Sequence, residues 1–163
     1  MNKLAVRTET NPNRARSQKR AQTGQTAVEF AIALPVLLVL LTAIVSLGVA
    51  FNHELQLTYA TNNATQLLSM SRGQTTDPCQ TASQAVYSSA PTLAQSNVKF
   101  TIVLAGTTVA SGAAQPSCGG SQTNLVQNQN AQVTTTYPCN LQIFGFNPAP
   151  SCNLTAQTTV MIQ

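Results

Sequence analysis

Residues 30–51 read FAIALPVLLVLLTAIVSLGVAF, a run of 22 residues without a charged side chain. The hydrocarbon core of a bilayer is about 30 Å thick, and a helix needs about 20 apolar residues to cross it. A helix on the surface of a soluble domain is apolar along one face only, whereas this segment is apolar all round. The run therefore predicts a transmembrane helix, which we place at residues 25–52.

Positive charge is concentrated before this helix. Residues 1–24 carry six basic side chains and one acidic side chain, a net charge of +5, whereas residues 25–163 carry two basic and three acidic side chains, a net charge of −1. Because Lys and Arg stay on the cytoplasmic side, we expect the N-terminus inside and the later residues outside. A basic tail is also typical of nucleic-acid binding. The apolar run that follows it favours a membrane, and no nucleic acid is expected as a partner.

A cleaved secretory signal is the alternative interpretation of the apolar run. The apolar region of such a signal usually spans about 7–15 residues and ends at a small-x-small cleavage site. Gly48 and Ala50 would form that site, and residues 1–50 would then be removed. The run is longer than this, and a secretory signal leaves Glu29 unexplained, so we favour the membrane anchor.

Glu29 stands one position before the apolar run. A carboxylate at membrane depth is costly and points to a function, although helix ends near the headgroups tolerate charge. The surrounding residues favour a function. Gly24 closes the basic tail, Glu29 is the fifth residue after it, and Phe30 follows at once.

This order of glycine, fifth-position glutamate, aromatic residue and membrane helix resembles the N-terminal signal of type IV prepilins. More narrowly, GQTAVEFAIALPVLLVLL is similar to the N-terminus of TadE-like minor pilins, the pseudopilins of tight-adherence (Tad/Flp) systems. The resemblance covers residues 20 to about 70. It implies that a prepilin peptidase cleaves between Gly24 and Gln25 and removes residues 1–24 as a leader. It also implies that Glu29 and Phe30 serve processing and assembly, with Glu29 against the terminal amine of a neighbouring subunit.

The resemblance further implies a bacterial inner-membrane protein with a cytoplasmic N-terminus and a periplasmic or extracellular C-terminal domain. Its implied partners are the prepilin peptidase, other major and minor pilins, an inner-membrane assembly platform and membrane lipid. The implied function is pilus assembly for adhesion, biofilm formation or secretion. Two alternatives stay open: a pseudopilin of a type II-like secretion system, and a membrane-tethered binding domain that does not polymerise.

The helix is expected to continue beyond the membrane. Apolar residues recur at three- and four-residue steps, which predicts helix through residues 53–72 with a stop near Gly73. This apolar stripe is expected to pack in the core of the exported domain. Its members are Leu57, Tyr59, Ala60, Ala64, Leu67, Leu68 and Met70.

Residues 73–163 predict an exported α+β domain. An Asp followed by Pro at 77–78 is typical of a helix start, and residues 78–89 are expected to form a short helix. Apolar and polar residues alternate over 98–104, which predicts a strand. Further strands are expected at 107–111, 131–137 and 153–162. The predicted fold is pilin-like, with a long N-terminal helix packed on a small disulfide-bonded antiparallel sheet.

All four cysteines lie on the exported side. An even number of cysteines outside the cytoplasm indicates disulfides, and four cysteines permit three pairings. We favour Cys139–Cys152, which would close the base of the loop between the last two strands, together with Cys79–Cys118. No C-x-x-C motif occurs, and the single histidine lies next to the membrane, so neither a metal nor a cofactor is expected.

The sequence offers few groups for catalysis. Beyond residue 55 the only carboxylate is Asp77, and the only bases are Arg72 and Lys99. General acid–base catalysis needs positioned groups with tuned pKa values, so we do not expect an enzyme.

The loop at residues 144–148 is a candidate contact surface. It carries Phe144 and Phe146, and the domain around it is nearly uncharged and rich in Thr, Gln and Asn. A loop that faces the core is the alternative, because single apolar residues in loops are common.

Overall fold

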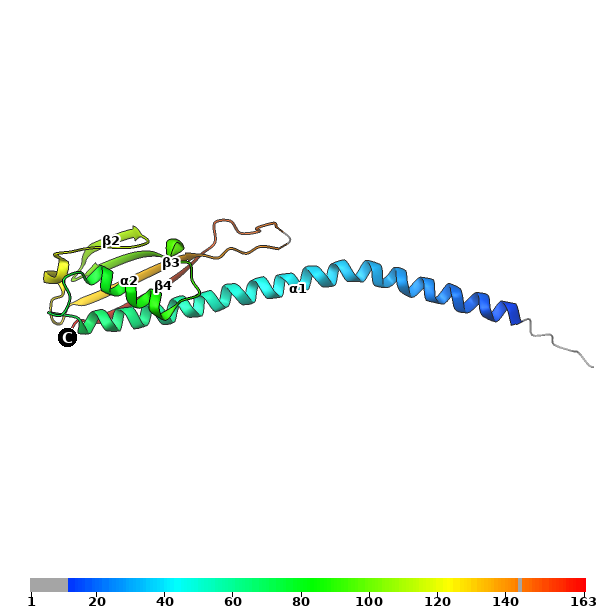
Figure 1. Ribbon diagram of the computed structural model, residues 1–163, viewed down its shortest axis with the longest axis horizontal. Helices are drawn as coiled ribbons and strands as arrows, with labels where there is room; N and C mark the ends of the chain where they lie inside the picture. Colours follow the sequence, from blue (N-terminus) through cyan, green and yellow to red (C-terminus); the bar gives the residue numbers. More distant parts are fainter. Residues whose placement is uncertain (1–11, 144) are drawn as a thin grey trace, which may run out of the picture. The chain divides into compact units, whose positions relative to one another are not determined.

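The computed structural model describes residues 12–143 and 145–163, with side chains from residue 25 onward. The chain divides into two compact units, Met1–Ala43 and Ile44–Gln163. The first unit holds the N-terminal part of helix α1 (Pro12–Met70). The second holds the rest of α1, helix α2 (Pro78–Ser89) and a four-stranded sheet (Figure 1). These elements, with two disulfides, confirm the α+β class.

Helix α1 exposes its apolar surface along the first unit. Its most apolar window has a mean hydropathy of 2.8, and none of that window is buried. Thr42, a polar side chain in this stretch, donates its hydroxyl to the carbonyls of Leu38 and Val39 at 3.0 and 2.9 Å. Pro35 lies inside the helix, where it removes one backbone hydrogen bond, a loss that membrane helices tolerate. Among the described residues, one helix is thus compatible with single-pass membrane anchoring.

The sequence predicts the C-terminal end of α1 better than its N-terminal end. The expected helix of the cleaved chain begins at Gln25, whereas in the intact chain the helix already begins at Pro12. At the other end, the amide and hydroxyl of Ser71 both donate to the Leu68 carbonyl, at 3.2 and 2.8 Å. Gly73 then adopts a φ of +74°, a left-handed conformation that glycine accepts without strain. The helix therefore ends at Met70, two residues before the predicted last helical residue, 72.

Helix α2 begins and ends where the sequence predicts. Asp77 is its N-cap, and the carboxylate accepts a hydrogen bond from the Gln80 amide at 3.0 Å. Pro78 follows at the start of the helix, where an N–H group is not needed. The amide of Ala90 closes the helix by donating to the Val86 carbonyl at 2.9 Å.

The sheet has the order β2-β1-β3-β4, and every neighbouring pair is antiparallel. Ala105 and Gly106, both with positive φ, make the two-residue turn between the first two strands. Each strand begins and ends within two residues of its predicted bounds. The strands are β1 (Lys99–Leu104), β2 (Thr107–Ala113), β3 (Asn130–Pro138) and β4 (Asn153–Met161).

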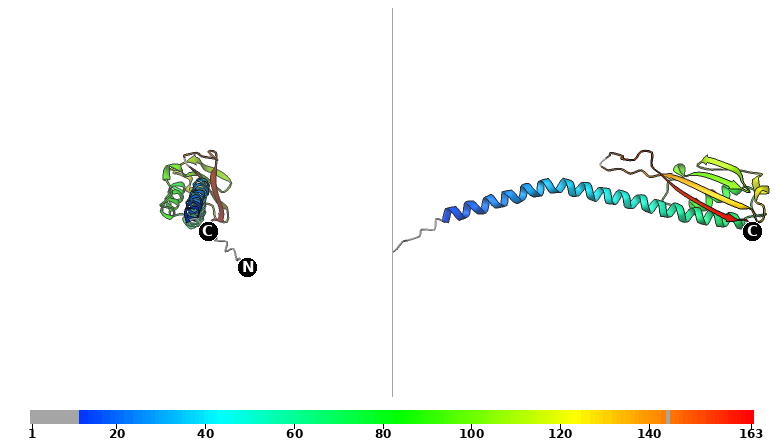
Figure 2. Two further views of the ribbon diagram at one scale, coloured as in Figure 1. Left: turned by 90° about the vertical axis from the view of Figure 1, so that its right-hand side faces the viewer. Right: turned by 180° about the vertical axis from the view of Figure 1, so that it is seen from behind.

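The core of the second unit lies between the sheet and the two helices, α2 and the C-terminal part of α1 (Figures 1 and 2). The alternating pattern of β1 buries Phe100, Ile102 and Leu104 completely. Leu57 and Leu68 of α1 meet this layer, and short alanine side chains between them let the helix approach closely. The core is small, so its two disulfides matter for stability.

The predicted apolar stripe of α1 is only partly correct. Leu57, Ala60, Ala64 and Leu68 are buried, as expected. Tyr59, Leu67 and Met70 were expected in the core, but the structure exposes 68%, 43% and 56% of them. The reason is geometric: successive helical residues are about 100° apart, so Tyr59 lies about 200° around the helix from Leu57. Two threonines, at positions 61 and 65, complete the buried face.

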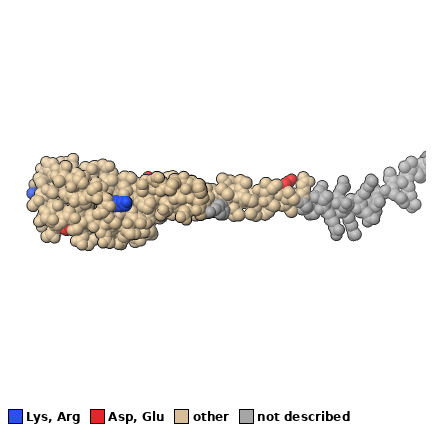
Figure 3. Space-filling view, turned by 90° about the horizontal axis from the view of Figure 1, so that it is seen from above, with Lys and Arg blue, Asp and Glu red and all other residues tan. Residues whose placement is uncertain are grey.

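The surface of residues 73–163 carries very little charge. Figure 3 shows a face on which Lys, Arg, Asp and Glu are few and isolated. Lys99 is the last charged side chain of the sequence, so the final 64 residues have none. This surface offers hydrogen-bonding and apolar groups, not ion pairs, to whatever it contacts.

Candidate functional site

The predicted cleavage junction lies within α1. The backbone is helical through residues 24 and 25. The side-chain amide of Gln25 donates to Glu29 Oε1 at 3.4 Å, one helical turn away. Phe30 is 65% exposed beside the carboxylate. The structure thus brings Gln25, Glu29 and Phe30 together on adjoining turns, on a surface that is open to other molecules.

Glu29 has a weak partner within its own chain. A hydrogen bond of 3.4 Å from a neutral amide is long for an N–H···O contact. Such a contact neutralises no charge, so the carboxylate at the start of the apolar run remains able to pair with a cation. This chemistry suits recognition of an ammonium group.

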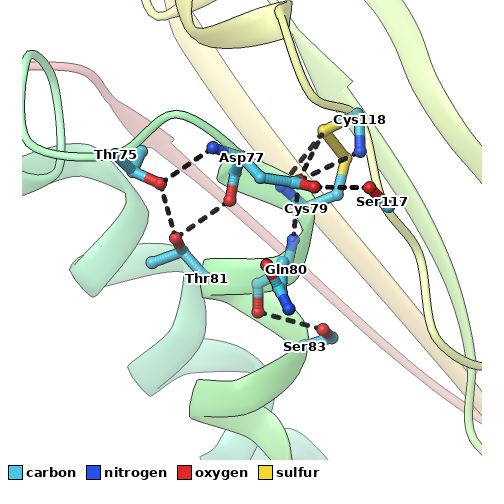
Figure 4. The surroundings of a disulfide bond; sticks show 8 residues. All are labelled: Thr75, Asp77, Cys79, Gln80, Thr81, Ser83, Ser117 and Cys118. Atoms are coloured by element: carbon cyan, nitrogen blue, oxygen red, sulfur yellow. Dashed lines mark hydrogen bonds between the residues drawn. A yellow bond between two sulfur atoms is a disulfide. The ribbon is translucent and has the colours of Figure 1, made fainter.

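A second polar cluster surrounds the Cys79–Cys118 disulfide (Figure 4). Asp77 Oδ1 accepts hydrogen bonds from the amides of Gln80 and Cys118, both at 3.0 Å, and Oδ2 accepts one from the Ser117 hydroxyl at 2.5 Å. One carboxylate therefore joins the start of α2 to the segment that carries the second cysteine.

These contacts decide the ionisation of Asp77. Partial burial raises its pKa, but the hydrogen bond from Ser117 and those from the amides of Cys118, Gln80 and Cys79 outweigh burial and lower the pKa below the ordinary value. The group is a stable carboxylate with its acceptor sites in use. It acts as a structural cap and not as a proton donor or acceptor.

The same cluster contains the group of potential metal ligands found in the described part of the chain, Asp77, Cys79 and Cys118. Both sulfurs belong to a disulfide, and a metal ligand needs a thiolate. In the oxidised protein the donor set therefore does not fit a metal ion.

The second disulfide closes a loop between β3 and β4. Cys139 and Cys152 are bonded, and the amide of Cys139 donates to the Cys152 carbonyl at 3.1 Å. Both disulfides are the pairings favoured from the sequence. Phe146 of this loop is 71% exposed, which agrees with a contact surface and not with a core-facing loop. Phe144, the other predicted contact residue, lies outside the described residues.

Two contacts between α1 and the C-terminal half of the chain were not predicted. Ser46 Oγ donates to the Gln142 carbonyl at 2.8 Å, across 96 positions of sequence. His53 stands edge-on to Tyr137, with ring centroids 5.5 Å apart. The sequence signal for the Ser46–Gln142 contact is a single serine in an apolar run. It was not recognised because a serine in such a run usually bonds its own helix.

Comparison with known proteins supports the N-terminal segment as the site. Residues 24–66 match the family model described as TadE-like protein, a range that contains Gly24, Glu29 and the apolar run. No curated protein and no solved structure matches the chain. The match confirms the resemblance seen in the sequence and supports a Tad pilus-associated protein. Residues 24–66 of this chain are thus similar to the TadE-like family, and the match covers about a quarter of the 163 residues.

Proposed function

We propose that this chain is a minor pilin, or pseudopilin, of a Tad/Flp pilus. A prepilin peptidase cleaves it between Gly24 and Gln25. Helix α1 holds it in the bacterial inner membrane with a cytoplasmic N-terminus, and residues 73–163 project to the other side. It then joins other major and minor pilins on an inner-membrane assembly platform, in a pilus that serves adhesion, biofilm formation or secretion.

The observation that carries the proposal is the position of Glu29. It is the fifth residue after Gly24 and the last charged residue before the 22 uncharged positions of the apolar run. The TadE-like match begins at Gly24 itself and extends across this motif. A carboxylate at this depth is expensive to keep unless a partner compensates it.

Cleavage would supply such a partner. Removal of residues 1–24 takes away a net charge of +5 and creates a positively charged α-amino group on Gln25. In a low-dielectric environment each lone charge is costly, and pairing offsets much of that cost. A pair between Glu29 of one subunit and the amine of its neighbour would set the register of the subunits more than it would stabilise them.

Gly24 also suits the cleavage step. A peptidase has to reach the carbonyl of residue 24, and a carbonyl within helical backbone is occupied by a hydrogen bond. Glycine inside a helix costs about 1 kcal/mol relative to alanine, so the helix is locally weakened where it has to open. Glycine also lets another backbone approach without a Cβ in the way.

The outer face of α1 in the second unit offers a surface for other subunits. Phe51, Leu55, Tyr59 and Met70 are all more than half exposed there. They lie on the side of the helix away from the buried leucines and alanines. An apolar face of this kind supports packing against other helices in an assembly.

The intact mass of the membrane form tests the proposal. The protein is purified from cells with and without the prepilin peptidase. A chain that lacks residues 1–24 only when the peptidase is present supports the proposal. A chain that begins at Met1 in both strains indicates a tethered domain instead, and one that lacks residues 1–50 indicates simple secretion.

A further inference from the structure

The loop between β3 and β4, residues 139–143 and 145–152 of the described chain, contacts α1 at Ser46, near the end of the apolar run. The Ser46 hydroxyl donates to the Gln142 carbonyl at 2.8 Å, and both residues belong to the second unit. Figure 1 shows the loop leaving the sheet and extending along α1. This contact relates a loop of the exported domain to a known position in the predicted membrane span.

That position can be converted to a depth. A bilayer core of about 30 Å corresponds to about 20 helical residues at about 1.5 Å each. Counted from Phe30, which follows the charged Glu29, the core ends near Val49. Ser46 then lies roughly 5 Å inside the outer border of the hydrocarbon. The loop that contacts it is therefore at the level where headgroups meet acyl chains.

The composition of the loop fits this level. Residues 139–152 contain no charged side chain, so no ion has to be desolvated there. Phe146 is 71% exposed, and Leu141 and Ile143 are half-buried. Aromatic and aliphatic side chains without nearby charge favour the boundary between headgroups and acyl chains, where apolar faces enter by about 5–10 Å.

The backbone of the loop is also suited to a low-dielectric environment. Ile143 and Phe146 exchange two backbone hydrogen bonds, both of 2.9 Å. The Asn147 side chain accepts a hydrogen bond from the Ala149 amide at 3.0 Å, and the two prolines of the loop bring no N–H group. Unsatisfied backbone groups are excluded from lipid, and here several are satisfied within the loop itself.

We propose that the described part of the disulfide-closed loop, residues 139–143 and 145–152, is a lipid-contacting anchor, with Phe146 seated in the outer leaflet of the membrane that α1 crosses. Its partner is the phospholipid surface at the boundary of headgroups and acyl chains. The proposal rests on the membrane anchoring contained in the proposed function, but not on cleavage or pilus assembly. Together with α1, the loop holds the exported domain on the membrane at two points instead of one.

Tryptophan fluorescence tests the anchor directly, because the chain contains no tryptophan. Three full-length variants each carry one reporter: Phe146→Trp in the loop, Leu40→Trp in the apolar run, and Val126→Trp as a matched exposed apolar control. Val126 belongs to the segment next to the last residues of the chain, and Gln163 bonds Ser69 of α1. Ser69 is 23 residues beyond Ser46, or about 35 Å along the helix.

Each variant is reconstituted into phosphatidylethanolamine–phosphatidylglycerol vesicles at a low protein-to-lipid ratio, with and without brominated acyl chains. We expect bromine to quench most of the emission of Phe146→Trp and Leu40→Trp and to leave Val126→Trp unchanged. The emission of Phe146→Trp should also lie at shorter wavelength than that of Val126→Trp.

The variants separate failure of the anchor from failure of the membrane span. If Leu40→Trp is quenched and Phe146→Trp behaves like Val126→Trp, the loop does not contact lipid, and only the helix anchors the chain. If Phe146→Trp shifts with rising protein density but is not quenched by bromine, the loop contacts a second subunit and the lipid proposal is wrong. If Leu40→Trp is not quenched, the membrane span and the anchor both fail.

Discussion

The hydroxyl oxygens of Thr61 and Thr135 lie 2.6 Å apart in the core, where α1 meets β3. Both residues are completely buried. The Thr61 hydroxyl donates to the Leu57 carbonyl at 2.7 Å, which leaves Thr135 as the donor to Thr61. The helix and the sheet are thus joined by a directed polar contact within an otherwise apolar interface.

This direction predicts unequal effects of two matched substitutions. Thr135→Val keeps the shape of the side chain and leaves Thr61 bonded to Leu57, so it should lower the free energy of unfolding by about 1 kcal/mol. Thr61→Val strands the buried hydroxyl of Thr135 and should cost about 1–3 kcal/mol. Chemical denaturation of the full chain in detergent measures both. Equal costs would contradict the assigned direction.

The lowered pKa of Asp77 predicts that the stability of the folded protein depends on pH. Its pKa is lowered in the folded protein from an ordinary value near 3.8, so its contribution is complete above that value and is lost as the pH falls through the folded pKa. Asp77→Asn keeps an acceptor for the cap but cannot ionise, and its unfolding midpoint should fall less on acidification than that of the wild type. Thermal denaturation of both proteins, followed by circular dichroism at pH 6 and at successively lower pH values, makes the comparison. Parallel curves would show that the hydrogen bonds to Asp77 do not depend on its charge.

The two disulfides are expected to contribute unequally because they close loops of different length. Cys79 and Cys118 are 39 positions apart, and Cys139 and Cys152 are 13 apart. In the chain-entropy model these closures stabilise the fold by about 4 and about 3 kcal/mol. Paired substitution of each disulfide by alanine should lower the unfolding midpoint in that order. The reverse order would indicate that the contacts of loop 139–152 with α1 outweigh loop entropy.

Glu29 and Glu54 provide a test variant and a matched control for the role of Glu29 in assembly. Both are exposed glutamates of α1, but Glu29 begins the apolar run and Glu54 follows it. If Glu29 pairs with the new N-terminus of a neighbouring subunit, Glu29→Ala should lose most of its copurification with pilus proteins, while Glu54→Ala keeps it. Affinity capture from membranes, at equal amounts of each variant, measures the loss. A Glu29→Ala variant that copurifies normally would remove the support for the register contact.

Local patterns predicted most of the elements. Asp77 and Pro78 set the first turn of α2, and strict alternation around Phe100 set β1, because both signals act over a few residues. Within the candidate site, the resemblance depended on Gly24, Glu29, Phe30 and the apolar run occurring in order, and the TadE-like match covers the same stretch.

The errors and omissions concern relationships in space. Tyr59 and Met70 fit a three- and four-residue spacing, but this spacing does not determine which side of the helix is buried. Packing of the helix on the sheet determines that side. β3 pairs with β1 across a long connection, and Ser46 bonds Gln142 across 96 residues. No local pattern carries this information, because these contacts depend on how the whole domain closes.

The final 64 residues contain no ion for dissolved electrolytes to screen. Screening acts on charges, so rising salt should not weaken interactions made by these side chains. Salts such as sulfate and phosphate strengthen the burial of apolar surface, so a structure assembled through this part of the chain should persist as their concentration rises.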